Sequence, residues 1–513
     1  MKEKSLQLYY YRNGGKYNME QRDLRKWISQ LENENLLKRV SAEVDWNLEI
    51  GSITRKVTSQ EGPALLFEDI KDHKDTWGKR FFTNGVGSEE RIALALNLDR
   101  KAGYREIVRT IKDRLFKLIK PIFTDNGPVK ENIIRENKID LYQFPVPKFH
   151  LKDGGRYINT TASIVTKDPD TGEYNLGIYR GMVVEKNKIG LLLVATQHWG
   201  FHYAKYKARG EPMPVACVYG WDPCLFFVSS MPIQHPYVPF GEYEHCGGLR
   251  ESPVELIKCE TSDLMVPASA EIVIEGVISP DPKDYVMEGP FGEYPGYYGG
   301  ARSPKPAIEV KCITFRNDPI LRGLLEGSTP GKLCEDGYWY CVGQTAAAWH
   351  ALVMAGVPNV LDVWTPREST STILRVRIDK LYRGHANQVA SAIWGTTVGN
   401  YAGKFVIVVD KDIDIHDEGA VNWAIAYRCN PGMDQILFYQ GCGSALDPSV
   451  PLSVRNPIKY GQGKWTKVLI DATKNWELEK EEQYGGEIFP PIATEIGPEQ
   501  EALINRRWKE YGF

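Results

Sequence analysis

The middle of the chain, from about residue 128 to residue 318, limits the possible folds more than any other feature of the sequence. It holds short runs rich in β-branched and aromatic residues, separated by turn-forming residues, at 157–166, 181–186, 189–195, 215–219 and 308–315. Such runs are typical of β-strands rather than helices. We therefore expect a β-barrel or β-sandwich domain in the centre of the chain.

The region before residue 126 has a different pattern, in which helical and extended segments alternate. A helix is expected over residues 19–38, because apolar residues recur there at roughly helical spacing, namely Leu24, Trp27, Ile28, Leu31 and Leu36. Gly62 and Pro63 form a turn into the apolar run at residues 64–67, and Ser88 can cap a helix whose first turn is acidic. These features predict a small α/β domain.

Beyond residue 318, helical patterns at 345–355 and 387–394 alternate with buried-strand patterns at 360–364 and 404–409. This alternation predicts a further α/β domain. We expect domains at residues 1–125, 126–318 and 319–513. The polar tail from Gly485, with a short helix starting near Pro498, is expected to be a surface or subunit-contact element.

Composition excludes several classes of function. With 513 residues, 42% of them hydrophobic, the chain exceeds what one hydrophobic core usually serves. Its 63 basic and 66 acidic residues leave a net charge of -3 and no basic tract, which argues against a nucleic-acid partner. The nine cysteines are odd in number and form no CxxC pair, so we expect a reducing, cytoplasmic location. The N-terminus lacks an apolar signal core, and no run of about 18 apolar residues predicts a membrane span.

The segment from Glu288 to Gly300, EGPFGEYPGYYGG, is the strongest candidate for a functional site. It places Glu288 and Glu293 around a Gly-Pro turn, and its five glycines and two prolines cannot form a regular helix. A solvated turn with two surface acids is the alternative. We expect the rings of this segment to be buried, which disfavours that alternative; they are Phe291, Tyr294, Tyr297 and Tyr298.

This segment resembles the motif loop of the UbiD decarboxylases, which use a prenylated flavin. Residues 258–276, 404–414 and 443–449 are similar to other stretches of that family, as are GPALLF at 62–67 and ERIALAL at 90–96. The resemblance thus extends over nearly the whole chain. It implies that the central domain is a flavin-reductase-like split β-barrel between two α/β domains.

The resemblance also implies a set of site residues. The family's catalytic Arg and two acids correspond to Arg180, Glu288 and Glu293. The expected contacts of prenylated FMN are Asn175, Ile178, Tyr179, Arg180, Gln197, His198, Glu242 and Lys404, with Lys404 at the phosphate. Asn175, His198 and Glu242 would bind Mn²⁺ or Mg²⁺, with K⁺ nearby, because oxygen ligands plus one imidazole suit these ions better than zinc. Glu244 competes with Glu242, since the preceding loop at 234–241 is longer than usual for the family.

Each of these residues has a simpler interpretation when taken alone. His198 can be a buried, hydrogen-bonded histidine, Arg180 an ion-pair partner at a strand end, and Asn175 a turn residue. His202 and Cys442 carry no comparable pattern and are expected to be structural. Because the candidate residues match one family pattern in order along the chain, the functional interpretation is favoured for the set as a whole.

The mechanism that the resemblance implies needs an electron sink, because loss of CO₂ from an unsaturated carbon leaves a charge that side chains cannot stabilise. The family's prenylated FMN supplies that sink. Arg180 would bind the substrate carboxylate, Glu288 would position Arg180, and Glu293 would donate a proton to the carbon that lost CO₂. We therefore expect a raised pKa for Glu293 and an ionised Glu288.

The expected activity is reversible decarboxylation of an aromatic, heteroaromatic or α,β-unsaturated acid, free or as an aromatic acyl-CoA. A carboxylase working in the CO₂-fixing direction and a non-catalytic flavin-binding protein remain alternatives. Segments 324–337 and 394–400 are expected near the substrate, with Cys334, His350 and Trp394 as weak candidates. A flavin prenyltransferase would supply the cofactor, and a homo-oligomer, dimer or hexamer, is expected.

Overall fold

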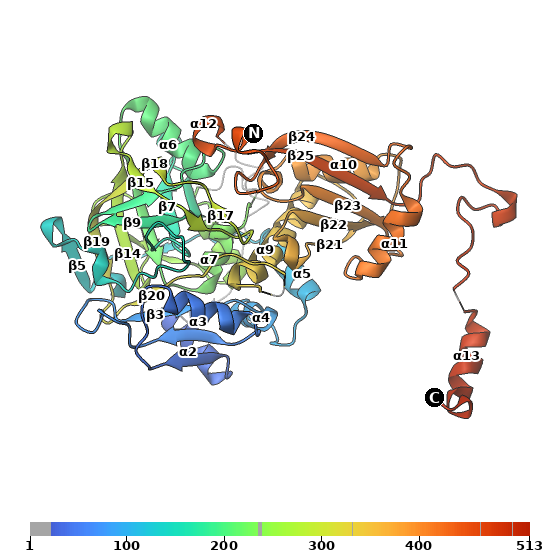
Figure 1. Ribbon diagram of the computed structural model, residues 1–513, viewed down its shortest axis with the longest axis horizontal. Coiled ribbons are helices and arrows are strands. Elements are labelled where there is room, and N and C mark those ends of the chain that lie inside the picture. Colours follow the sequence, from blue (N-terminus) through green and yellow to red (C-terminus); the bar gives the residue numbers. More distant parts are fainter. Residues whose placement is uncertain (1–21, 234–238, 331, 462, 495) are drawn as a thin grey trace.

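The computed structural model describes residues 22–513, apart from 234–238, 331, 462 and 495 (Figure 1). The predictions made for the N-terminus, for residues 19–21 of the first helix and for 234–238 of the loop before Glu242 lie outside these residues. In Figure 1 the N-terminal part (blue) packs below a central sheet (green to yellow), and the C-terminal sheet (orange) lies beside both. This arrangement confirms a mixed fold, in which a β-rich centre lies between two α/β parts.

The N-terminal part is a small sheet with strand order β1-β2-β3-β20, covered by helices. Its strands are β1 (Leu37–Val40), β2 (Ala64–Phe67), β3 (Arg80–Thr83) and β20 (Ile320–Arg322). Its helices are α2 (Leu24–Asn33), α3 (Glu49–Thr58), α4 (Glu89–Ala95) and α5 (Tyr104–Arg114). Strand β20 joins this sheet from a distant part of the sequence and pairs in parallel with β3.

Two N-terminal predictions can be compared with the structure directly. The Ser88 hydroxyl accepts a hydrogen bond from the Arg91 backbone N–H, so the predicted cap of α4 is confirmed. The helix expected over 19–38 is wrong at its end, because α2 stops at Asn33 and Leu37 begins β1. Asn35 causes this end, since its φ of 58° is left-handed and cannot continue a helix.

The central sheet has the order β6-β9-β10-β19-β14-β11-β7-β8, with β5 paired to β19, and curls into a half-barrel. Its described strand pairs are antiparallel. The strands are β5 (Asn132–Arg135), β6 (Arg156–Tyr157), β7 (Ser163–Lys167), β8 (Tyr174–Ile178), β9 (Gly181–Glu185), β10 (Lys188–Leu191), β11 (Met213–Tyr219), β14 (Ile272–Ile278) and β19 (Ala307–Phe315). The run predicted at 157–166 is divided between β6 and β7, because the chain leaves the sheet between them.

Helices and short strands surround this half-barrel. The helices are α6 (His198–Arg209), α7 (Pro223–Ser230) and α8 (Glu242–Arg250). The short strands are β4 (Ile122–Phe123), β12 (Glu255–Lys258), β13 (Met265–Pro267), β15 (Val286–Glu288), β16 (Phe291–Gly292), β17 (Tyr298–Gly299) and β18 (Ser303–Lys305). Strand β15 pairs with β18, and β16 pairs with β17, so the segment from Glu288 to Gly300 is held in two small hairpins.

The C-terminal part is a sheet with order β21-β22-β23-β25-β24, parallel in its centre and antiparallel at both edges. Its strands are β21 (Val360–Trp364), β22 (Ile373–Ile378), β23 (Phe405–Asp410), β24 (Ile436–Gly443) and β25 (Gly463–Ala472). Its helices are α9 (Glu335–Met354), α10 (His385–Trp394), α11 (Glu418–Arg428) and α12 (Pro457–Tyr460). Helix α9 starts well before the predicted residue 345, because it is buried on nearly all sides and has no polar face to mark its beginning.

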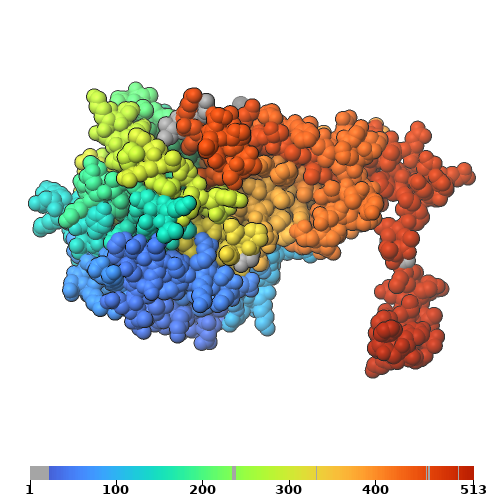
Figure 2. Space-filling model, viewed as in Figure 1, coloured from blue at the N-terminus to red at the C-terminus, as the bar shows by residue number. Residues whose placement is uncertain are grey.

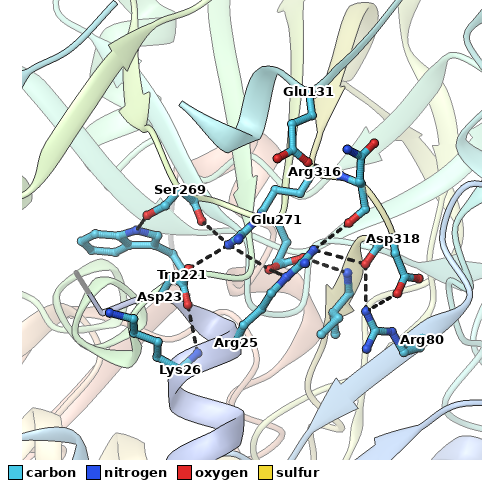
Figure 3. A network of polar contacts seen from close by, with 12 residues as sticks. Asp23, Arg25, Lys26, Arg80, Glu131, Trp221, Ser269, Glu271, Arg316 and Asp318 are labelled. Carbon is cyan, nitrogen blue, oxygen red and sulfur yellow. Dashed lines mark hydrogen bonds and ion pairs between the residues drawn. The ribbon is translucent and has the colours of Figure 1, made fainter. Parts of the chain in front are cut away.

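A polar network fixes α2 against the central sheet (Figure 3). The Arg25 guanidinium forms two hydrogen bonds with the buried Glu271 carboxylate, at 2.8 and 3.0 Å. Arg316 Nη1 donates to Asp23 at 2.8 Å, and Trp221 Nε1 donates to Ser269 Oγ at 2.9 Å. The N-terminal part is thereby attached to the scaffold that carries the central strands.

The C-terminal tail leaves the body of the molecule and ends in α13 (Pro498–Arg507), which lies apart from the rest (Figure 2). No residue of α13 is buried. Within the described residues, no helix has both the length and the apolar character needed to cross a bilayer. All nine cysteines are free thiols.

Candidate active site

Arg180 lies between two carboxylates in the interior of the molecule. It follows β8, and its guanidinium forms two hydrogen bonds of 3.0 Å with the carboxylate of Glu288, which ends β15. Its Nη1 also forms an ion pair with Glu293, which follows β16. The exposed fractions of the three side chains are 5%, 0% and 7%, so these charges interact in a largely water-free environment.

Two further side chains contact Glu288 directly, whereas the charge of Lys305 acts on Glu293 only from a distance. Lys305, which ends β18, forms an ion pair with Glu288 Oε2, and the Tyr157 hydroxyl donates to Oε1 at 2.8 Å. Strand β18 positions Lys305 because it pairs with β15, the strand that carries Glu288. Glu288 therefore receives hydrogen bonds from three residues, and Glu293 from Arg180.

The two carboxyl groups are consequently shifted in opposite directions. Burial alone would raise the pKa of Glu288, but the charges of Arg180 and Lys305 outweigh burial and hold this pKa below its ordinary value. Burial raises the pKa of Glu293, and the single Arg180 contact does not reverse that shift. These are the directions expected for an ionised carboxylate and a nearby proton donor.

Only some of the aromatic rings of the segment from Glu288 to Gly300 are buried as predicted. Phe291 is fully buried and stacks on Tyr157 at a centroid distance of 4.1 Å, and Tyr294 is half-buried. The expectation that Tyr297 and Tyr298 are buried is wrong, since they are 61% and 41% exposed. Tyr297 lies in the turn between β16 and β17, and Tyr298 begins β17, so both are at the outer tip of the hairpin.

A cavity of about 250 Å³ opens beside Arg180 and Glu293. Its walls come from the central half-barrel and from the C-terminal part, which meet here. Residues from the central part include Asn175, Ile178, Tyr179, Arg180, Gln197, His198, Glu242 and Glu293, and those from the C-terminal part include Tyr340, Gln344, Ser371, Asn400, Tyr401 and Ser444. Most of the predicted flavin and metal residues thus share one cavity with two of the predicted catalytic groups.

The predicted metal ligands come from three elements that meet at this cavity. Asn175 lies in β8, His198 begins α6, and Glu242 begins α8. Glu242 Oε2 accepts a hydrogen bond from the Leu176 backbone N–H at 2.8 Å, which fixes it next to Asn175. Glu244 is fully buried and does not line the cavity, so the geometry favours Glu242 of the two. Within the described residues, no group of three or more His, Cys, Asp or Glu side chains could hold a metal ion. The predicted set contains only two side chains of these kinds, His198 and Glu242, because its third ligand is the amide of Asn175.

The segment around Gln197 forms one wall of the cavity. Gln197 precedes α6, and its side-chain oxygen accepts a hydrogen bond from Trp199 Nε1 at 3.0 Å. The Trp199 ring stacks on Tyr179 with centroids 4.0 Å apart and planes 5° from parallel. This packing fixes Gln197 and Tyr179 at the cavity surface. Both contacts are within the protein, so they are formed without a bound ligand.

Comparison with known proteins decides the family. Profiles described as the N-terminal, Rift-related and C-terminal domains of 3-octaprenyl-4-hydroxybenzoate carboxy-lyase (UbiD) match residues 28–111, 121–329 and 338–472. The chain belongs to the UbiD family. It is therefore a member of a family of carboxy-lyases.

Solved structures of UbiD proteins resemble the chain over nearly its full length. Vanillic acid decarboxylase of Sedimentibacter hydroxybenzoicus, in its closed form, has a TM-score of 0.83 and 30% identity, covering 95% of this chain and 99% of that chain. The UbiD-class enzyme HmfF of Pelotomaculum thermopropionicum, in complex with FMN, has a TM-score of 0.74 and 31% identity, covering 94% and 98%. An evolved dimeric form of HmfF in complex with prFMN has a TM-score of 0.70 and 29% identity, covering 90% and 96%.

Lys404 is the predicted UbiD cofactor residue that the structure does not bring to the cavity. It precedes β23, and its ammonium donates to Asp447 at 2.8 Å and to Ser449 at 2.6 Å. It is absent from the cavity lining. Its predicted phosphate contact therefore has no geometric support, although the neighbouring residues Ser444 and Leu446 do line the cavity.

The three weak candidates for substrate contact also lie outside the cavity lining. Cys334 is buried beside Arg55, His350 packs on Phe116 at 4.3 Å, and Trp394 stacks on Tyr439 at 5.2 Å. Segments 324–337 and 394–400, which contain Cys334 and Trp394, do reach the cavity, although through other residues. Glu326 from segment 324–337 and Asn400 from segment 394–400 both line the cavity.

Sequence reasoning missed several polar residues of this UbiD site. Lys305, Tyr157, Glu326, Tyr340 and Gln344 were not selected, although the first two contact Glu288 and the other three line the cavity. A four-residue spacing places Tyr340 and Gln344 on one face of α9. That spacing was the available signal, but the helix containing it was predicted to start too late.

Proposed function

We propose that this UbiD-family protein is a prenylated-FMN-dependent decarboxylase of an aromatic, heteroaromatic or α,β-unsaturated acid. One observation carries the proposal: Arg180 is buried between two carboxylates with opposite pKa shifts, beside a cavity large enough to admit a ligand. A purely structural ion-pair network would not need an adjoining cavity.

The residues present fit the proposed cofactor and ions. The amide of Asn175, the imidazole of His198 and the carboxylate of Glu242 suit Mn²⁺ or Mg²⁺ bound to a phosphate. Thr196 Oγ1, next to Gln197, is a buried oxygen of the cavity wall with no hydrogen-bond partner among the residues described, so a ligand group can satisfy it. The bound FMN and prFMN of the HmfF structures support the same assignment. We include K⁺ in the proposal on the family resemblance alone.

Arg180 would bind the substrate carboxylate through a guanidinium face that Glu288 holds in a fixed orientation. Lys305 and Tyr157 would keep Glu288 ionised, so that Glu288 continues to pair with Arg180 throughout the reaction. When bound, prenylated FMN would supply the electron sink for loss of CO₂. Glu293, whose pKa is raised by burial, would transfer its proton to the carbon that lost CO₂ and be reprotonated from solvent.

Two alternatives differ from this function in direction or in kind. A carboxylase would use the same residues in the CO₂-fixing direction, because a catalyst lowers one barrier for both directions. A non-catalytic flavin-binding protein would not need Arg180 and Glu293 at the cavity. The geometry therefore favours an enzyme and leaves the direction to measurement.

We further propose four features that rest on the sequence pattern and on the resemblance to the UbiD family. They are a homo-oligomer, a flavin prenyltransferase as cofactor supplier, a cytoplasmic location and domains at 1–125, 126–318 and 319–513. The free thiols support a reducing compartment. The dimeric form of HmfF supports an oligomer.

The function is tested by incubating cofactor-loaded protein with a panel of aromatic and unsaturated acids, including aromatic acyl-CoA thioesters with a free carboxylate. The proposal expects CO₂ release with at least one acid, and none from Arg180→Met protein with the same flavin content. Loaded protein that neither releases CO₂ nor incorporates isotope-labelled bicarbonate into the decarboxylated products would instead support a non-catalytic role.

A further inference from the structure

A third carboxyl group, that of Glu326, faces the candidate active site. Glu326 lies between β20 and α9, is only 6% exposed and lines the same cavity as Glu293. The charges of Glu293 and Arg180 both act on it, which places it within electrostatic range of the proposed catalytic groups. The proposed mechanism assigns it no role.

The backbone at Glu326 is fixed by side chains from distant parts of the chain. The carbonyl oxygen of Glu326 accepts hydrogen bonds from Arg55 Nη2 of α3 at 2.8 Å and from His150 Nε2 at 3.0 Å. Asp336 holds the following turn, accepting from the Gly327 N–H at 2.9 Å and from the Ser328 hydroxyl at 2.7 Å. Such support fixes the direction in which the Glu326 side chain leaves the loop.

The side chain itself has no corresponding support. In the part of the chain that the structure describes, the Glu326 carboxyl makes no hydrogen bond with the protein. The Tyr340 hydroxyl makes none there either. Gln344 Oε1 is buried without a partner in the same set. Tyr340 and Gln344 are four residues apart on α9 and line the cavity together with Glu326. Because an unpartnered buried polar atom such as Gln344 Oε1 is costly, this wall is suited to a polar ligand group.

We propose that Glu326, Tyr340 and Gln344 form a subsite for a neutral hydroxyl group on the ring of an aromatic acid substrate. This inference rests on the proposed function and narrows its substrate class. Arg180 would take the carboxylate of the acid, and the polar wall would take the ring hydroxyl. The three residues are specificity-determining groups and have no part in the proton transfer.

The chemistry of the wall favours a hydroxyl over a charged substituent. Burial and the neighbouring Glu293 and Asp336 raise the pKa of Glu326 well above its ordinary value, which favours the neutral carboxyl, a group that can both donate and accept. A carboxamide and a phenol likewise offer both functions. A hydroxyl also donates and accepts, whereas a ring ammonium needs an ionised acceptor and a second carboxylate would have no cation on this wall.

The test uses FMN-loaded protein and three probes: benzoate, hydroxybenzoate with the hydroxyl in the meta or para position, and the corresponding methoxybenzoate. Binding is measured by titration calorimetry, and flavin content by absorbance. We expect a hydroxybenzoate to bind about tenfold more tightly than benzoate and methoxybenzoate, the value of roughly one well-formed hydrogen bond. Glu326→Leu and Tyr340→Phe should each reduce this preference to less than about threefold while flavin content is unchanged.

Glu61→Leu is the matched control, since Glu61 contacts Tyr338 outside the cavity and its loss should leave the preference intact. Tyr340→Phe keeps the test decisive if Glu326→Leu does not fold. Equal binding of the three probes, or a preference that survives both variants, overturns the subsite and leaves the proposed function standing. Loss of flavin from the variants would show that these residues bind the cofactor, and this result would also overturn the proposed hydroxyl subsite. If none of the probes binds flavin-loaded protein, both the subsite and the proposed site for aromatic acids fall.

Discussion

Glu288 and Glu293 contact the same guanidinium, yet their surroundings differ. Glu288 interacts with Arg180, Lys305 and Tyr157, whereas Glu293 has only Arg180 and a buried position beside the cavity. The number of cationic partners explains why one carboxyl is held ionised and the other favours its protonated form. At the scale of single residues, the proposed acid chemistry follows from this asymmetry.

Glu293→Gln should lower turnover by at least about 100-fold, because the amide keeps the size of the side chain but cannot donate the required proton. Flavin content should be unchanged, since the proposed metal and flavin ligands are untouched. Steady-state CO₂ release and the absorption spectrum measure the two quantities. A variant with full activity would remove Glu293 as the proton donor.

The pH dependence of kcat should reflect the raised pKa of Glu293. A proton donor is active in its protonated form, so kcat should fall as the pH rises through that pKa, which burial holds above the ordinary value for a glutamate. Glu288 should not limit kcat in the same range, because Arg180 and Lys305 hold its pKa below the ordinary value for a glutamate. A pH series of CO₂ release checks this, and a kcat that rises with pH over the same interval would contradict the assignment.

The sequence predicted the residues that lie in short motifs and missed those that only the fold brings together. Arg180, Asn175 and the two glutamates could be selected because each lies in a recognisable segment. Lys305 reaches Glu288 through the pairing of β15 with β18, and Glu326 reaches the cavity through contacts with Arg55 and His150. Such pairings between distant segments have no local pattern. The half-buried Tyr294 and the exposed Tyr297 likewise could not be separated without knowing where the hairpin turns.

At the scale of elements, the attachment of α2 depends on Arg25. Its partner Glu271 is fully buried, whereas Arg25 itself is 35% exposed. Arg25→Met should therefore leave a buried carboxylate poorly compensated and destabilise the N-terminal part by about 2 kcal/mol. The expected readout is a lower midpoint of the first thermal transition.

Arg39→Met is the matched control, because Arg39 pairs with Glu32 and Glu68 at the surface, where such pairs contribute less than about 1 kcal/mol. An Arg25 variant no less stable than the Arg39 variant would show that the network in Figure 3 contributes little to the attachment of α2.

Elements with local signals could be predicted, and elements defined by their surroundings could not. The cap at Ser88 and the apolar strands β2 and β23 have short, clear patterns. The early part of α9 has none, since Tyr338, Trp339 and Cys341 are buried on different sides of the helix. Its start is decided by packing against the rest of the protein, which the sequence does not display.

At the scale of the whole molecule, the end of the tail lies apart from the body, and no residue of α13 is buried. The exposed apolar side chains of the tail include Ile492, Ile496, Leu503, Trp508, Tyr511 and Phe513. Removing residues 485–513 should lower the oligomeric mass while leaving the thermal transitions of the body unchanged, because these side chains are expected to contact another subunit. Light scattering after size-exclusion chromatography gives the mass, and an unchanged mass would contradict the predicted subunit contact.

We propose that the cavity beside Arg180 binds prenylated FMN and that Asn175, His198 and Glu242 would hold the accompanying metal. The most direct test is native mass spectrometry of protein co-expressed with a flavin prenyltransferase and supplied with Mn²⁺ and K⁺. We predict a bound mass equal to FMN plus the prenyl group, which is lost together with the metal in His198→Ala protein. Wild-type protein that remains empty under these conditions would contradict the cofactor assignment and the decarboxylase mechanism built on it.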